Sequence, residues 1–283
     1  MRLFKRLLLV LLVLTATTFS AAAQDESLEF ISWTEPQMNL YSAEIPINWQ
    51  INAGIVDFLG SPQPNIVLMS ADSSIAVIAG LNQRYVFLEP NESLGLYEGD
   101  ALPFGDWSIP IVQQVSPAEF LSYYLDELLI SAAVCADIEY DALPELDGNR
   151  DYRAGEVTLE CTYDAGVASG YFYVALYTIE DASGARFWMP GDLFGFLAEP
   201  GAEVIAQEAL MRLAQTLTID AEAAQAYTLE YQHGTNDMDA LLMQDFQNQV
   251  DQMMRSHMVA TFSNTMYWNC VNTQIINGGS GNC

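Results

Sequence analysis

Two consecutive stretches, 156–163 and 171–179, constrain the fold more than any other part of this sequence. In the first, apolar and polar residues alternate, with Val157 on the apolar face and Glu156 on the polar face, as in a strand with one buried side. The second is apolar on both faces, which indicates a central strand covered twice. The sequence therefore predicts two adjoining strands at the centre of a sheet, followed by a turn at 181–184 and a third apolar strand.

The rest of the chain predicts an α+β fold, a mostly antiparallel sheet packed by helices. A helix is expected to begin at Ser116, with Pro117 in its first position and Glu119 completing a capping box. A closing helix carries apolar residues at helical spacing over 206–217. Further strands are expected at 28–33, 41–49, 66–69, 74–81 and 85–88.

The first 23 residues have the pattern of a secretory signal peptide. Three basic residues precede a short apolar run, and an Ala-Ala-Ala cleavage site follows at 21–23. The apolar run is shorter than the ~20 residues that span a bilayer, so we expect a secreted or periplasmic protein without a transmembrane segment after cleavage. The remaining chain is predicted to form an α+β domain at 24–220 and a helical, Met-rich appendage at 221–283.

The composition limits the partners. Beyond residue 23 the chain has six arginines, no lysine and 37 acidic residues, a formal charge of −31. Nucleic acid is bound through Lys and Arg contacts with phosphate, so this surface repels it. Basic partners are favoured, and weak binding of divalent cations fits the same charge. The lack of lysine also excludes Schiff-base chemistry and Ser-Lys dyads.

Four cysteines lie beyond the signal peptide, at Cys135, Cys161, Cys270 and Cys283. An even number in an exported chain indicates two disulfides. Three pairings are open, and we favour Cys135–Cys161 and Cys270–Cys283, because the members of each pair are close in sequence. A metal site is disfavoured, since no Cys-x-x-Cys spacing occurs.

One sequence motif, together with the order of the predicted elements, resembles a known family. Tyr41, Ile45, Pro46 and Trp49 form aromatic-x-x-x-Ile-Pro-x-x-Trp, followed by a hairpin, a Ser-Pro-started helix, three strands and a final helix. This order resembles the PsbP-like fold, which includes photosystem lumenal proteins, nuclear-import relatives that bind a small GTPase, and exported LpqN-like bacterial lipoproteins. Most members bind or assemble rather than catalyse, so the resemblance implies a non-enzymatic role, although a fold does not fix a function.

No recognised catalytic, cofactor or metal-binding set occurs in the sequence. Neither histidine stands in His-Glu-x-x-His spacing, and no Gly-x-Ser-x-Gly elbow is present. We therefore predict no catalytic, cofactor or metal residues. The alternative is a secreted hydrolase that uses two acids, with the candidate pairs Asp126 with Glu127 and Glu139 with Asp141.

A contact role is predicted for two groups of apolar residues. Aromatic residues in Gly/Pro-rich segments either line a ligand surface or cover the sheet, and a Met-rich helix at 238–258 either packs on its own domain or binds a partner. The residues concerned are Phe104, Trp107, Trp188, Phe194, Phe246, Met253 and Met254. We thus predict an exported, non-enzymatic binding or assembly protein, whose partner is another protein or an envelope component.

Overall fold

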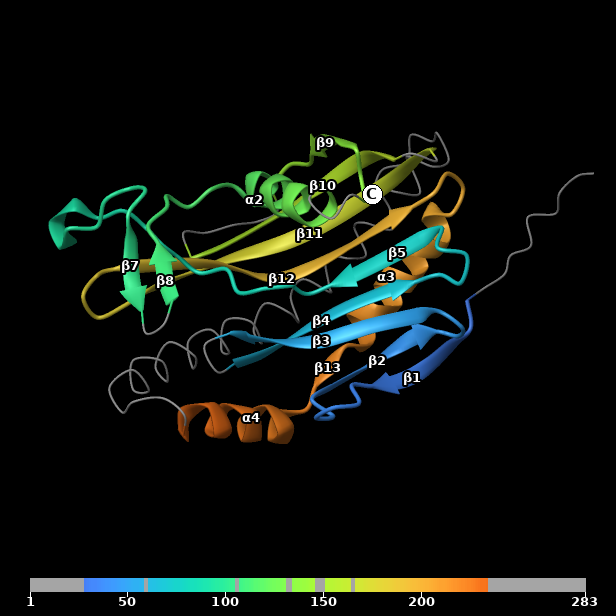
Figure 1. Cartoon of the computed structure of the whole chain (residues 1–283), viewed down its shortest axis with the longest axis horizontal. Helices are drawn as coiled ribbons and strands as arrows, with labels where there is room; N and C mark the ends of the chain where they lie inside the picture. Colours follow the sequence, from blue (N-terminus) through green and yellow to red (C-terminus); the bar gives the residue numbers. More distant parts are fainter. Residues whose placement is uncertain are drawn as a thin grey trace, which may run out of the picture.

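The computed structural model describes residues 28–58, 61–104, 107–130, 134–145, 151–163 and 166–233. Their main element is an eight-stranded sheet in which neighbouring strands run antiparallel (Figure 1). Its path is β3-β4-β5-β12-β11-β10-β9, and β6 pairs with β12 beside this path. The strands are β3 (Gln50–Phe58), β4 (Ser61–Met69), β5 (Ile75–Ala79), β6 (Phe87–Leu88), β9 (Asp137–Ala142), β10 (Tyr152–Tyr163), β11 (Gly166–Glu180) and β12 (Arg186–Ala198).

The centre of the sheet agrees with the sequence prediction. Strand β11 lies between β10 and β12, and its residues from 172 to 179 are buried. In β10 the predicted alternation holds for Val157, which is buried, but Glu156 was predicted on a solvent face and is only 3% exposed. That prediction is wrong because the second face of the sheet is covered too. The Tyr171 hydroxyl donates a 2.9 Å hydrogen bond to the buried Glu156 carboxylate.

Helix α2 (Pro117–Leu125) covers one face of β10 and β11 and begins where the sequence predicts. The Ser116 hydroxyl accepts a hydrogen bond from the Glu119 amide (3.2 Å), and the Glu119 carboxylate accepts one from the Ser116 amide (2.8 Å). These are the two bonds of a capping box. The helix continues as a π-helical turn, η2 (Asp126–Ile130), and its buried side chains pack in one cluster with Val157.

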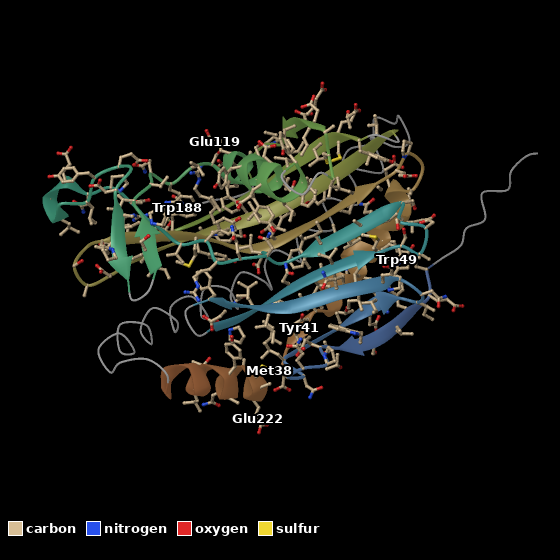
Figure 2. The ribbon with its side chains drawn as sticks, viewed as in Figure 1. Met38, Tyr41, Trp49, Glu119, Trp188 and Glu222 are labelled. Atoms are coloured by element: carbon tan, nitrogen blue, oxygen red, sulfur yellow. A yellow bond between two sulfur atoms is a disulfide. The ribbon has the colours of Figure 1, made fainter. Side chains whose placement is uncertain are left out.

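Helix α3 (Glu203–Thr216) covers the opposite face and packs on β5, β12 and β2. It leads into β13 (Thr218–Ile219), which joins β2 (Tyr41–Pro46) and β1 (Phe30–Thr34) in a three-stranded sheet of order β1-β2-β13. The Tyr41 hydroxyl donates to the Gly54 carbonyl (2.8 Å) and so ties β2 to β3 (Figure 2). Helix α4 (Ala221–His233) follows and contacts β4.

The structure is richer in strands than the sequence predicts. Strand β3 was not predicted, and the Gly/Pro-rich stretch before α2 contains a 3-10 helix, η1 (Glu92–Leu94), and a hairpin of β7 (Ala101–Phe104) and β8 (Trp107–Pro110). The result is a strand-rich α+β arrangement with a mostly antiparallel sheet. Within the described ranges, no helix combines the length and the apolar character needed to cross a membrane.

The disulfide Cys135–Cys161 is present as predicted and joins the segment after η2 to β10. Both cysteines are buried. The predicted signal peptide, most of the predicted appendage and the pair Cys270 and Cys283 lie outside the described residues, and the domain boundary at 220 therefore stays a prediction.

Candidate functional site

The candidate site lies where strand β12 changes partners on one side. Residues 194–198 of β12 pair with β5, and residues 187–188 pair with β6. Across the interval 189–193, no strand of the described chain pairs with β12 on that side. Pro190, which has no backbone N–H to donate, falls in this interval, as expected where a ladder is interrupted. The interruption leaves room for a pocket inside the sheet layer.

On its other side, β12 carries a β-bulge in the same interval. The register with β11 shifts by one residue between Val174 and Leu176, so Ala175 faces both Gly191 and Asp192. A bulge bends its strand and redirects the side chains it carries, and bulges are frequent beside active and binding sites. Asp192 is thereby placed at the gap between β5 and β6.

We call the resulting pocket the bulge pocket; the space free of atoms in and around it amounts to about 740 Å³, a figure that includes open solvent. Strands β3, β4, β11 and β12 and the segments that follow β5 and α3 form its walls. Most of its lining side chains are apolar. The described lining residues are Val56, Phe58, Gln63, Pro64, Gly80, Leu81, Gln83, Tyr177, Met189, Pro190, Gly191, Asp192, Leu193, Phe194, Leu217 and Ile219.

Asp192 and Tyr177 are the two titratable residues among these lining residues. The Tyr177 hydroxyl donates a 2.8 Å hydrogen bond to Oδ2 of Asp192. Burial raises the pKa of Asp192 to about 6, although the hydrogen bond from Tyr177 acts to lower it. Burial, together with the charge of Asp192, raises the pKa of Tyr177 far above 10, so the phenol stays a neutral donor. The pocket thus holds a carboxyl group whose charge changes near neutral pH, a property that is common at functional sites.

Gly191 makes this hydrogen bond sterically possible. A Cβ atom at position 191 would lie 2.1 Å from Cε2 of Tyr177, well inside van der Waals contact. The glycine therefore lets the tyrosine ring lie across the bulge and reach Asp192.

Further tyrosines continue from the pocket along the same face of the sheet. The rings of Tyr152 and Tyr177 are 5.4 Å apart, and the hydroxyls of Tyr152 and Tyr173 are 3.1 Å apart. Burial and the neighbouring Glu156 raise the pKa of Tyr171 well above its ordinary value, which keeps that phenol protonated as a donor to Glu156. Glu156 is therefore held in a structural hydrogen bond, while Asp192 is the acid that lines the pocket.

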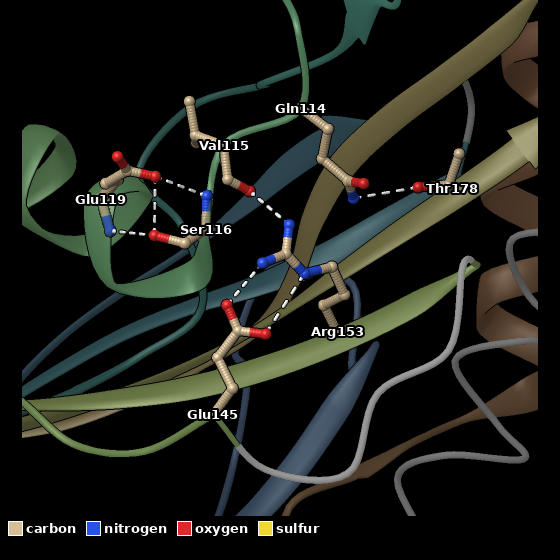
Figure 3. Close-up of polar contacts among 7 residues, drawn as sticks. All are labelled: Gln114, Val115, Ser116, Glu119, Glu145, Arg153 and Thr178. Carbon is tan, nitrogen blue, oxygen red and sulfur yellow. Dashed lines mark hydrogen bonds and ion pairs between the residues drawn. The ribbon is translucent and has the colours of Figure 1, made fainter.

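The arginines of the described chain are all engaged with acids outside the bulge pocket. Figure 3 shows Arg153, whose guanidinium binds Glu145 and donates to the Val115 carbonyl (3.2 Å), beside the capping box of α2. In the same view, the Gln114 amide donates to the Thr178 hydroxyl (3.0 Å) and holds the loop before α2 on the sheet. The other pairs are Arg84 with Asp57, Arg186 with Glu89, and Arg212 with Glu44.

The structure separates the predicted contact residues. Trp188 is 2% exposed, stacks on Phe87 at a centroid distance of 4.2 Å and donates its indole N–H to a backbone carbonyl (2.8 Å), so it lies in the core (Figure 2). Phe194 is partly buried and lines the bulge pocket. Phe104 and Trp107 lie opposite each other in the register of β7 and β8. Their contact roles stay predictions.

Three predicted contact residues, Phe246, Met253 and Met254, lie outside the described residues. The bulge pair Asp192 and Tyr177 was not predicted as functional. A signal for it was present, because Pro-Gly-Asp inside an apolar strand suggests a bulge.

The four acids proposed for a hydrolase are all exposed, on η2 and β9. Asp126 accepts a hydrogen bond from the Tyr140 hydroxyl (2.8 Å), and Glu127 accepts one from the Tyr85 hydroxyl (2.9 Å). None of the four lines the bulge pocket. Across the part of the chain that the structure describes, no group of three His, Cys, Asp or Glu residues is placed to hold a metal ion.

Comparisons with known proteins give little further information. No family model and no curated protein matches the sequence. One similar solved structure is that of LpqN, described as involved in cell envelope biogenesis of Mycobacterium tuberculosis; the match has 12% identity, covers 69% of this chain and 92% of LpqN, and has a TM-score of 0.29. A TM-score of this size does not establish a shared fold, so the PsbP-like assignment stays a prediction.

Proposed function

We propose that this protein is an exported, non-enzymatic binding protein that holds a small apolar ligand in the bulge pocket. The observation that carries the proposal is the lining of the pocket, which is apolar around one part-buried acid–tyrosine pair. Ligand sites typically combine an apolar wall with a few convergent polar groups. The two glutamines of the lining bond elsewhere: Gln63 donates to Ser61 (3.2 Å) and Gln83 to the Tyr85 hydroxyl (2.7 Å).

Binding is favoured over hydrolysis by the number of acids in the pocket. A glycosidase needs two carboxyl groups on opposite sides of the bond it cleaves. The described lining supplies one, Asp192, and its partner is a tyrosine that stays protonated. A single carboxyl in an apolar wall suits the orientation of a bound ligand better than acid–base hydrolysis.

Export is supported by the signal-like first 23 residues and by the buried disulfide Cys135–Cys161, since disulfides persist in oxidising compartments. The ligand therefore comes from the cell envelope or the surrounding medium. The Met-rich segment 238–258 is proposed as a separate contact surface, and pull-down from an envelope fraction with and without residues 221–283 tests it.

The pocket is tested with the neutral apolar fluorophore N-phenyl-1-naphthylamine and the full chain from residue 24. Val56 lies on β3 in the wall of the pocket, and Val56→Trp fills the space beside it. We expect the wild type to bind and brighten the probe, and Val56→Trp to lose most of that signal. Asn52→Trp, at an exposed position on the same strand, is the matched control and keeps it. Equal probe binding by all three proteins would refute the proposal.

A further inference from the structure

We infer that the ligand of the bulge pocket is an apolar amine, whose ammonium group pairs with the Asp192 carboxylate. The inference rests on the proposed function, because it names the chemical class of the ligand held there. It is carried by three features of the described lining: the second oxygen of the Asp192 carboxyl group, the lack of a cation among the described lining residues, and the aromatic wall.

The geometry leaves one carboxylate oxygen for a ligand. Oδ2 of Asp192 accepts the hydroxyl of Tyr177 at 2.8 Å. Within the described part of the chain, Oδ1 accepts no hydrogen bond, and the residue lines the pocket. A carboxylate is an acceptor only, so the ligand group that meets it must be a donor. Tyr177 stays protonated, and it already donates its one hydroxyl hydrogen to Oδ2, so it does not also serve Oδ1.

Charge selects an ammonium group among the possible donors. A carboxylate in an apolar wall is costly unless a cation compensates it. The described lining contains no arginine, and the four described arginines are paired with other acids. The sequence has a single lysine, Lys5, which lies in the predicted signal peptide together with Arg2 and Arg6. The two arginines left, Arg150 and Arg255, also lie outside the described residues. A cationic ligand supplies the charge that the described lining lacks.

The walls favour an amine that carries an apolar body. Phe58 and Phe194 join Tyr177 in the lining, and aromatic faces attract ammonium groups as well as apolar chains. The formal charge of −31 beyond residue 23 also raises the local concentration of cations and lowers that of anions such as carboxylates. A fatty acid is therefore disfavoured at both the surface and the site.

Isothermal titration calorimetry with octylamine, octanol and octanoate tests this inference at pH 7.5. These probes share one apolar chain and differ in the head group. We expect octylamine to bind the wild type about 10- to 100-fold more tightly than octanol, the range of a hydrogen bond to a charged partner, and octanoate to bind most weakly. In Asp192→Asn the preference for octylamine disappears, while octanol binding is kept. Asp141→Asn removes an exposed acid of β9 and keeps the preference, which separates the pocket from nonspecific attraction to the acidic surface.

Lowering the pH to 5 gives a second readout. Tyr177 and Asp192 are the titratable residues among the described lining, so protonation of Asp192 weakens octylamine binding toward that of the Asn variant. If octanol binds as tightly as octylamine and Val56→Trp abolishes both, the pocket stands and the amine inference is overturned. If Val56→Trp changes the binding of none of the three probes, the proposed function is refuted as well. Octylamine binding that survives Asp192→Asn overturns the inference.

Discussion

Replacing Asp192 by asparagine should make the protein more stable at neutral pH. Asparagine has the same shape and keeps an oxygen acceptor for the Tyr177 hydroxyl, but it carries no charge into the apolar wall. The pKa of Asp192 rises from an ordinary value of 3.8 to about 6 on burial, which corresponds to about 3 kcal/mol, since a tenfold change in equilibrium is worth about 1.36 kcal/mol. Asp192 keeps part of its surface open to the pocket, and water there screens its charge. We therefore expect a gain of about 1–3 kcal/mol.

The sign of this effect depends on pH. The folded protein holds the proton of Asp192 more tightly than the unfolded chain does, because its folded pKa is the higher one. The protonated group contributes its full stability below about pH 3.8, and that stability is lost as the pH rises through about 6. Other carboxyl groups oppose this trend; hydrogen bonds from Ser70 and Ser74 lower the pKa of Asp72 to about 2, for example. Such contributions are common to wild type and variant and cancel in their difference.

Urea unfolding of both proteins at several pH values between 4 and 7.5 measures that difference. The free energy of unfolding of Asp192→Asn should exceed that of the wild type by a margin that grows from near zero at pH 4 to its full size above pH 6.5. Asp141→Asn, which removes one exposed charge, controls for the acidic surface as a whole. A margin that is independent of pH, or one that favours the wild type at neutral pH, would refute the assigned environment of Asp192.

Three further changes test the scaffold by chemical unfolding. Gly195→Ala should cost about 1–3 kcal/mol, because its Cβ would lie 2.1 Å from a phenylalanine ring of β11, whereas Gly54→Ala, with no atom within 4 Å of its Cβ, should be nearly neutral. Ser116→Ala removes the N-cap of α2 and should cost about 1 kcal/mol; an unchanged midpoint would count against the capping box. The Cys135→Ala, Cys161→Ala double variant should lose about 3 kcal/mol, as expected for a loop of 26 residues, and reducing agent should then have no further effect on this domain.

Local sequence signals predicted the features that depend on neighbouring residues. The capping box of α2 follows from Ser116 and Glu119, three positions apart, and the central position of β11 follows from its two apolar faces. The burial of Glu156 could not be predicted in this way, because it depends on a tyrosine of the next strand. Strand β3 was missed because Ala53 and Gly54 interrupt its apolar residues, which leaves no regular alternation along the strand.

The bulge pocket was missed for a physical reason of the same kind. Asp192 and Tyr177 lie 15 residues apart and meet only through strand pairing, and the pocket exists only because β5 and β6 leave part of β12 uncovered. Predicting either feature requires knowing the register in which the strands pair, which the sequence alone does not provide. Pro190 and Gly191 indicate from the sequence where a bulge lies. They do not indicate which neighbouring side chain the bulge turns toward the pocket.

The pairing of β13 with β2 has a consequence for how the chain matures. Thr218 of β13 lies opposite Ser42 of β2, so β2 pairs on this edge with residues 176 positions later in the chain. A polypeptide that emerges with its N-terminus first must keep the edge of β2 uncovered until nearly the whole domain has appeared, and open edges of this kind promote aggregation. Leu217 and Ile219, at and just before β13, are also the last of the described lining residues of the bulge pocket to be synthesised. Truncation before residue 217 would therefore leave both an unprotected strand and a pocket with one wall missing.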